Sequence, residues 1–276
     1  MRRTLFVGFA LICLATVAGA QQPSVSVAES EAITRTALNY AEGWYEGDGA
    51  KMASSLHPEL AKRIVQKDAE GRAELGQMSA LALRDATAAG SGTGTPPERR
   101  FKDVRILDVS ENVAQVRVEM SDWIDYMQMA RWNGQWKILN VLWELKPKPG
   151  QSVVADAAVI KRPALDYVEA MASGDEWRME RALHPDLVRR TVVVQANGRS
   201  KLLSQSAMTL WLLTRDGACG AAGHSRRPNR EVVILDQFEN IAFLKVQTAD
   251  TVEYLHVAHW SGQWKVVNVL WAPRAE

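Results

Sequence analysis

Cysteine is nearly absent from this sequence, which contains two in 276 residues. Cys13 lies in the apolar stretch near the N-terminus, so the rest of the chain holds only Cys219. A lone cysteine excludes an intramolecular disulfide bond and a metal site built from several cysteines. Stability must therefore come from packed apolar cores, to which the ten tryptophans contribute. We expect neither a metal nor a cofactor.

The chain also lacks an excess of positive charge. It has 33 Lys and Arg residues against 32 Asp and Glu residues, and two of the basic residues are Arg2 and Arg3 near the N-terminus. A nucleic-acid surface needs a basic surplus to neutralise phosphates. Nucleic acid is therefore not an expected partner.

Long hydrophobic runs are missing after residue 20. The opening "MRRTLFVGFALICLATVAGA" combines a basic start, an apolar stretch and a small-residue end, which is typical of a secretory signal peptide. It is short for a lasting membrane span, although an N-terminal anchor is the alternative. We expect a signal peptide at 1–20 with cleavage after Ala20, a secreted or periplasmic protein, and no membrane association after cleavage.

One phrase occurs twice. "GQWKILNVLW" at 134–143 returns as "GQWKVVNVLW" at 262–271, and "LHPEL" at 56–60 returns as "LHPDL" at 183–187. A nearly constant offset across such landmarks indicates an internal duplication. Pro147 and Pro149 mark the boundary, since they forbid a continuing helix or central strand. The predicted domains are 21–146 and 151–276.

Within each copy the hydrophobic period changes once. Apolar residues from Ile33 to Trp44 recur at helical spacing, a short helix is expected between Asp48 and His57, and a further helix over 74–88. From residue 101 the pattern alternates, which predicts strands at 101–109, 113–120, 122–132 and 135–145. Helices followed by antiparallel strands give an α+β fold.

The last two strands should form a hairpin. Asn133-Gly134 favours a type I′ turn, and Ser261-Gly262 takes its place in the second copy. An uninterrupted register counted from this turn pairs Met127 with Asn140 on one face and Ile124 with Trp143 on the other. Neither face is plainly polar, so both sides of the sheet require cover.

This arrangement resembles the nuclear transport factor 2-like superfamily, and more narrowly its putative lumazine-binding branch. The residues that carry the resemblance are "NYAEGWYEGDGAKMASSLHPEL", "DWIDYMQMARWNGQWKILNVLWE" and their second-copy equivalents. The resemblance implies two tandem cone-shaped domains, each with helices packed on a curved antiparallel sheet. Because members of the superfamily pair through the outer faces of their sheets, it also implies that the two halves pair with each other as an internal pseudo-dimer.

The pairing divides each sheet into a face toward the other copy and a face into the cone. We assign to the shared wall Ile124, Tyr126 and Trp143, with Val252, Tyr254 and Trp271 from the second copy. The face that carries Asp125 and Asn140 would then line the cone. The reverse assignment stays open, because periodicity does not orient a sheet that is covered on both sides.

A cone with an apolar interior suits a small, apolar or planar ligand. The candidate ligand-binding residues are Tyr40, Trp44, Trp123, Met127, Asn140, Tyr167 and Asn268. A carboxylate in such a cavity has a raised pKa and can exchange protons near neutrality. The candidate catalytic pairs are therefore Asp125 with His57 and Glu253 with His184, while purely structural roles are the alternative for all four.

These residues support three hypotheses. The first is an exported protein that binds a small molecule without catalysis. The second is a cofactor-free lyase or isomerase that uses the carboxylate–histidine pair. The third is a structural or protein-interaction module, because a fold does not determine a function. Trp44 becomes Met171 and Trp123 becomes Thr251 in the second copy, so either the copies bind different ligands or only one keeps a working cavity; the extra tryptophans favour the first copy.

Overall fold

A computed structural model describes residues 25–217, 231–248 and 250–274. The expected signal peptide and Cys219 lie outside the described residues. The first copy contains the helices α1 (Val27–Glu46), α2 (Gly49–Ser55) and α3 (Ala80–Ala88), the short 3-10 helix η1 (Pro97–Arg99), and the strands β1 (Leu56–Lys67), β2 (Ala73–Met78), β3 (Lys102–Ser110), β4 (Val113–Met120), β5 (Trp123–Trp132) and β6 (Gln135–Leu145).

The second copy repeats this order. Its elements are α4 (Ala157–Ser173), α5 (Glu176–Ala182), β7 (Leu183–Val194), β8 (Ser200–Ser206), α6 (Ala207–Arg215), β9 (Glu231–Phe238), β10 (Ile241–Gln247), β11 (Thr251–Trp260) and β12 (Gln263–Pro273). The α+β duplication expected from the sequence is therefore confirmed along the described chain.

The helix boundaries follow from local sequence. The Ser26 side chain accepts a hydrogen bond from the Glu29 backbone N–H and begins α1, which ends at Gly47 in the left-handed conformation, with φ of 72°. Asp48 then begins α2 by accepting from the Lys51 N–H. This tight connection places α1 and α2 against each other on one side of the sheet.

Each sheet has six strands rather than the four predicted. The order is β2-β1-β6-β5-β4-β3 in the first copy and β8-β7-β12-β11-β10-β9 in the second. Strand β1 runs parallel to β6 and β7 runs parallel to β12, so each sheet is mixed, while all its other neighbouring strands are antiparallel as expected. Strand β1 was missed because Lys62 and Arg63 interrupt its apolar pattern, and β2 was absorbed into the predicted helix over 74–88.

The predicted hairpin turns are confirmed. Asn133 and Gly134 have φ values of 48° and 81°, and Ser261 and Gly262 have 49° and 80°, as a type I′ turn requires. The register of the hairpin was wrong, however. A β-bulge lets Gln128 pair with Asn140 and Met129 with Ile138, so that Leu139 is an extra residue. Every residue of β6 beyond this bulge therefore lies on the face opposite to the one that the uninterrupted register predicts.

Three apolar clusters fill the molecule. One lies between the helices and sheet of the first copy and includes Ile33, Met127 and Val141, and an equivalent cluster fills the second copy. We call these interiors the first cone and the second cone. A third cluster lies between the sheets, contains Ile124, Tyr126, Val252 and Tyr254, and is called the wall.

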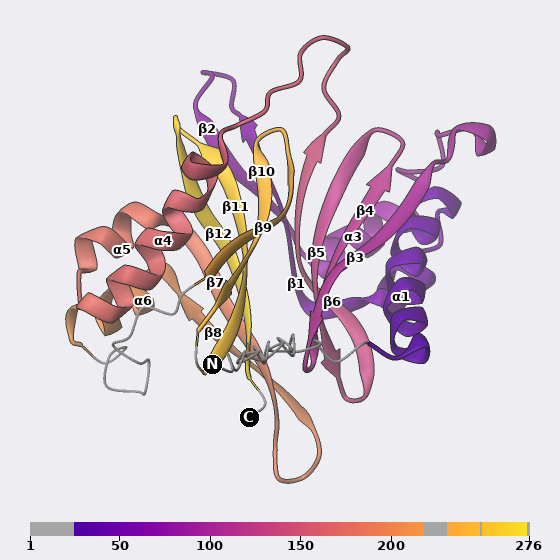
Figure 1. Cartoon of the computed structure of the whole chain (residues 1–276). Helices are drawn as coiled ribbons and strands as arrows, with labels where there is room; N and C mark the ends of the chain where they lie inside the picture. Colours follow the sequence, from indigo (N-terminus) through magenta and orange to yellow (C-terminus); the bar gives the residue numbers. More distant parts are fainter. Residues whose placement is uncertain (1–24, 218–230, 249, 275–276) are drawn as a thin grey trace, which may run out of the picture.

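The two sheets face each other in the centre of the molecule, with the helices of each copy on the outer sides (Figure 1). Polar contacts across the wall come in matched pairs. Tyr126 donates to Asp236 at 3.1 Å, and its counterpart Tyr254 donates to Asp108 at 2.7 Å. The internal pseudo-dimer is thus present, and Ile124, Tyr126, Val252 and Tyr254 lie in the wall as expected.

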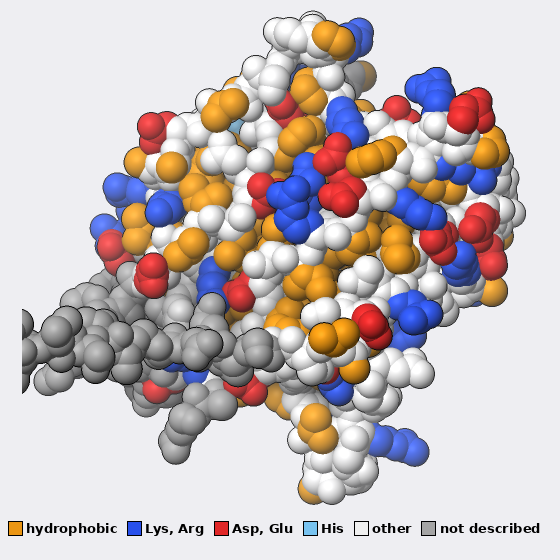
Figure 2. All heavy atoms as spheres, turned by 45° about the vertical axis from the view of Figure 1, so that its right-hand side comes forward, with side chains coloured by type: hydrophobic (Ala, Val, Ile, Leu, Met, Phe, Trp, Pro, Cys, Tyr) orange, Lys and Arg blue, Asp and Glu red, His pale blue; other side chains and the backbone are white. Residues whose placement is uncertain are grey.

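The surface carries charges of both signs. Figure 2 shows basic and acidic side chains next to one another on one face, with apolar patches between them. Among the described residues, no helix combines the length and apolar character needed to cross a membrane.

Candidate functional site

A buried ion pair forms the floor of the first cone. The Lys62 ammonium lies 2.5 Å from Asp125 Oδ1 and donates to the Tyr40 hydroxyl at 2.7 Å. Tyr40 in turn donates to Asp125 Oδ1 at 3.3 Å, and the Trp123 indole N–H donates to Asp125 Oδ2 at 2.8 Å. All three polar partners of the carboxylate thus come from residues in or beside the cone.

Three elements bring these side chains together. Tyr40 lies on the buried stripe of α1, Asp125 lies on the cone face of β5 with Met127, and Lys62 lies on β1. Leu60 belongs to the core of the first cone, and side chains two residues apart share a face, so Lys62 also points into the cone. Arg63, one residue later, points into the wall instead.

Burial dominates the electrostatics of the floor. It lowers the pKa of Lys62, while the Asp125 carboxylate acts in the opposite direction. Burial also raises the pKa of Tyr40 well above its usual value, and Asp125 adds to this shift. Tyr40 is therefore a neutral phenol at physiological pH, and it both accepts from Lys62 and donates to Asp125.

Three partly exposed tryptophans surround this floor. The Trp44 and Trp123 rings meet edge to face with their centroids 5.9 Å apart, and Trp123 and Trp143 do so at 6.2 Å. The Lys62 ammonium lies 4.7 Å from the centroid of the Trp143 ring, within cation–π range. Trp143 therefore belongs to the cone and not to the wall, because the bulge in the hairpin reverses its face.

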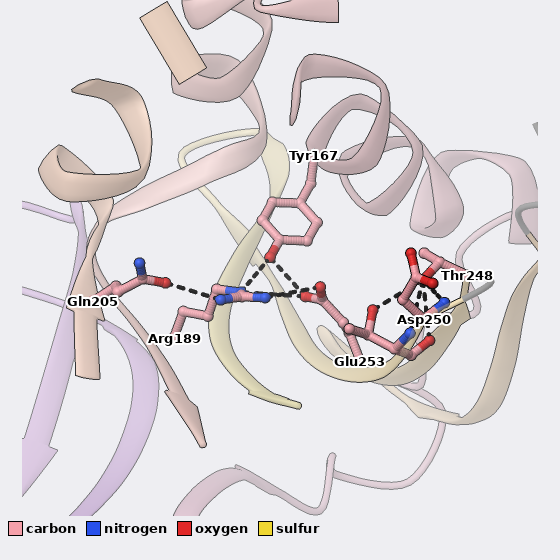
Figure 3. A network of polar contacts seen from close by, with 7 residues as sticks. Tyr167, Arg189, Gln205, Thr248, Asp250 and Glu253 are labelled. Carbon is pink, nitrogen blue, oxygen red and sulfur yellow. Dashed lines mark hydrogen bonds and ion pairs between the residues drawn. The ribbon is translucent and has the colours of Figure 1, made fainter. Parts of the chain in front are cut away.

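The second cone holds a related ion pair with longer side chains (Figure 3). Arg189 donates to Glu253 Oε1 at 3.0 Å and to the Tyr167 hydroxyl at 2.9 Å, and Tyr167 donates to Glu253 Oε2 at 2.7 Å. Gln205 on β8 accepts a further hydrogen bond from Arg189 at 2.9 Å. The guanidinium also lies 4.6 Å from the Trp271 ring, so Trp271 faces the second cone rather than the wall.

The mouths of the two cones differ. Met171 and Thr251 are both buried and replace Trp44 and Trp123, so the second cone lacks two of the three tryptophans. In the first cone, the buried ion pair lies beside three tryptophans that are partly exposed to solvent, and we call these tryptophans the mouth of the first cone.

The expected carboxylate–histidine pairs are not formed. His57 Nδ1 accepts from the Glu59 backbone N–H at 3.1 Å, and its ring packs on Trp132 with centroids 4.3 Å apart. His184 does the same with the Asp186 N–H and with Trp260. Burial lowers the pKa of both histidines to about 4. Asp125 and Glu253 instead contact Lys62 and Arg189.

Asn140 and Asn268 were placed in the cones by the uninterrupted register, and this was wrong. Because the bulge precedes them, both lie in the wall. Asn140 donates to Gln128 and accepts from Arg190 of the second copy at 2.9 Å. Asn268 accepts from Arg63 of the first copy, also at 2.9 Å. Met127, in contrast, is buried in the first cone as expected.

Sequence reasoning missed Lys62 and Arg189. Both lie within strands that were not predicted, which hid their direction. A signal was nevertheless present, since a basic residue occurs at the same position of both copies, 127 residues apart, two residues after the buried Leu60 and Leu187. No group of three potential metal ligands is found within the described residues.

Comparison with known proteins identifies one family. The family described as putative lumazine-binding matches residues 28–144 and again 155–272. A search of curated proteins finds no match.

Solved structures with similarity to this chain include two NTF2-like proteins of unknown function. The one from Shewanella baltica OS155 has 18% identity over 44% of this chain and 97% of its own, with a TM-score of 0.35. The one from Silicibacter pomeroyi DSS-3 has 20% identity over 42% of this chain and 94% of its own, with a TM-score of 0.33. Because the family covers most of both copies, the chain belongs to the putative lumazine-binding family.

Proposed function

We propose that this protein binds a small planar molecule in the mouth of the first cone and performs no chemistry on it. The observation that carries the proposal is the group of three partly exposed tryptophans, Trp44, Trp123 and Trp143, around the buried Lys62–Asp125 pair. Aromatic rings at a cavity mouth offer apolar area to a flat ligand, which stacks on one ring or meets its edge.

The polar floor supports binding rather than proton transfer. Asp125 already accepts from Lys62, Tyr40 and Trp123, and Tyr40 holds its proton because burial raises its pKa. A general base needs a free acceptor within hydrogen-bond reach of the proton it removes. In the first cone the histidine that would relay this proton packs elsewhere, against Trp132.

The family description makes lumazine the first probe. Quenching of tryptophan fluorescence by lumazine, a pterin and riboflavin should give saturable binding by at least one of these flat heterocycles. Trp44→Met and Trp123→Thr place the second-copy residues in the first cone, and each should weaken that binding about tenfold or more, since an aromatic contact contributes ~0.5–1.5 kcal/mol beyond the buried area.

Trp132→Phe is the matched control, because Trp132 packs against the wall outside the cone. It should leave the affinity unchanged. Binding that survives both cone substitutions would place the site elsewhere. Absence of binding by all three probes, with no ligand retained in native mass spectrometry of protein purified from its host, would reject the proposed function.

We also propose that the protein acts outside the cytoplasm, in the periplasm or as a secreted protein. The basic, apolar and small-residue pattern of residues 1–20 supports this location. The mature protein should begin at Gln21 when its N-terminus is sequenced from the host. An intact Met1 on the major species would contradict it.

A further inference from the structure

A pocket lies between α5, α6 and the start of β7, beside the core of the second cone, with which it shares Met179 and Leu183. Its volume is about 390 Å³, within the lower range of small-molecule sites. Its lining is mainly apolar and consists of Trp177, Met179, Glu180, Leu183, His184, Pro185, Ala207, Met208 and Trp211. None of the residues of the buried Arg189–Glu253–Tyr167 cluster takes part in it. We call this pocket the helical cleft.

Two tryptophan rings line the cleft. The Trp177 and Trp211 rings meet edge to face with centroids 6.3 Å apart. Trp177 is 62% exposed and Met208 is 64% exposed, so large apolar side chains face solvent at the cleft. Exposed apolar area concentrated around a concave site is a property of binding surfaces.

The first copy lacks these tryptophans although its backbone is equivalent. At an offset of 127 residues, Ala50 stands for Trp177, Leu81 for Met208 and Arg84 for Trp211. Arg84 forms an ion pair with Asp85, so this part of the first copy is polar. The two tryptophans are therefore not needed to form the helix pair, and the fold alone does not explain their presence.

The cleft also contains a hydrogen-bond donor without an acceptor. His184 is 3% exposed, and its Nδ1 accepts from the Asp186 backbone N–H. Burial lowers the pKa of His184 to about 4, so the ring is neutral and its single proton lies on Nε2. Nε2 has no hydrogen-bond partner among the described residues and is buried from solvent, as is the corresponding Nε2 of His57 in the first copy. The neighbouring Trp260 ring, at 4.8 Å between centroids, offers at most a weak π contact.

We propose that the helical cleft is a second ligand site, which takes a flat, uncharged aromatic molecule that carries a carbonyl oxygen. The ring system lies against Trp177 and Trp211, and the carbonyl oxygen accepts from His184 Nε2. Among the described residues that line the cleft there is no Lys or Arg, and Glu180 carries a negative charge, so the lining itself does not favour an anion. An unpaired buried donor is unfavourable, and an acceptor on the ligand would offset part of that cost.

A pair of probes of equal shape tests both parts of this site. The full-length protein is labelled with 5-fluorotryptophan, and its ten tryptophan signals are followed by fluorine NMR during titration with 2-acetylnaphthalene or 2-ethylnaphthalene. The signals of Trp177 and Trp211, assigned through the variants below, should shift with 2-acetylnaphthalene. 2-Ethylnaphthalene lacks the carbonyl oxygen and should bind at least fivefold more weakly.

Trp177→Ala and Trp211→Arg restore the first-copy residues at surface positions and should each reduce the affinity at least tenfold while the protein stays folded. Leu81→Ala, at the Met208 position of the first copy, should leave it unchanged. His184→Gln should remove the preference for the carbonyl compound, whereas His57→Gln should not.

The proposal is overturned if no signal shifts, or if only the tryptophans of the first cone respond. Equal binding of the two probes would also overturn it. Sedimentation provides a last test, because self-association that Trp211→Arg abolishes would make this face an interface between copies of the chain. None of these results depends on whether lumazine binds in the first cone.

Discussion

Each cone contains one basic and one acidic side chain, and both members of this pair differ between the two copies. The first cone has Lys62 with Asp125, and the second has Arg189 with Glu253. Both pairs are completed by a tyrosine from the first helix of the copy. A buried charge is tolerated only when its partner is present, so neither member can change alone.

Removing one partner should therefore be costly. Asp125→Asn leaves the Lys62 charge unpaired, and we expect it to lower the free energy of unfolding by about 3–5 kcal/mol. The double variant Lys62→Met with Asp125→Asn should recover part of this loss, because it removes the charge as well. Urea denaturation of the two variants gives the comparison. A double variant less stable than Asp125→Asn would show that Lys62 stabilises the fold even without the carboxylate, through Tyr40 and Trp143.

A buried histidine in the wall makes stability depend on pH. His256 replaces Gln128 of the first copy and is completely buried, and burial lowers its pKa well below 6.5. The folded protein holds this ring neutral, whereas the unfolded chain protonates it below about pH 6.5. Its contribution is therefore fully present above pH 6.5 and is lost as the pH falls, at up to about 1.4 kcal/mol per pH unit.

His256→Gln should flatten this dependence. Between pH 6.5 and 5 the variant should lose about 1–2 kcal/mol less stability than the wild type. Glu144, whose pKa burial raises to about 7, acts in the opposite direction over this range, but it is present in both proteins and cancels. If the unfolding free energies of His256→Gln and the wild type changed with pH in parallel, His256 would not be the source of this pH dependence.

At the scale of elements, the sequence predicted what depends on local chemistry. The α1 stripe, the strands β3 to β6 and both type I′ turns lie within a residue or two of their predicted positions. The bulge at Leu139 was not predictable from apolar alternation, because both faces of β6 are buried and carry similar residues. This single extra residue put Asn140 and Trp143 on the wrong faces.

Strand β1 shows a second limit. Its parallel partner β6 lies far away in the sequence, and its charged side chains find partners only in the folded molecule. Lys62 pairs with Asp125, and Arg63 donates to Asn268 of the other copy. No local pattern reveals such compensation. The candidate site was thus half predicted, with its carboxylates and tyrosines found and its cations missed.

The turn of the second hairpin offers a test at this scale. Ser261 has a φ of 49°, a conformation that asparagine adopts more readily than serine. Ser261→Asn reproduces the Asn133-Gly134 turn and should raise the free energy of unfolding by ~0.5 kcal/mol. The shift in the urea midpoint at constant slope measures it. A lower midpoint would mean that contacts outside the turn decide the cost.

At the scale of the molecule, the wall is held by contacts that the duplication makes reciprocal. Arg63 donates to Val267 O and Asn268, and Arg190 donates to Leu139 O and Asn140. The β1–β2 and β7–β8 hairpins also reach across to the opposite copy, as the Trp260 bond to Ala73 O and the Asn112 bond to Val192 O show. The two copies therefore interlock rather than merely touch.

This reciprocity predicts the behaviour of half the chain. Residues 25–148 alone would expose Ile124, Tyr126 and Leu142, but they contain both members of each contact, since Asp108 corresponds to Asp236 and Asn140 to Asn268. The isolated half should form a symmetric dimer, which light scattering after size exclusion can measure. A stable monomer would show that the first half does not need the wall.

The linkage between β6 and α4 has a further consequence for stoichiometry. An assembly of two identical subunits carries every substitution twice, so its two binding sites must gain or lose a ring together. In the fused chain, a substitution enters one half only. The tryptophans beside the first cone and those of the helical cleft each lack a counterpart in the other copy, so one molecule would hold two unlike ligands in a one-to-one-to-one complex.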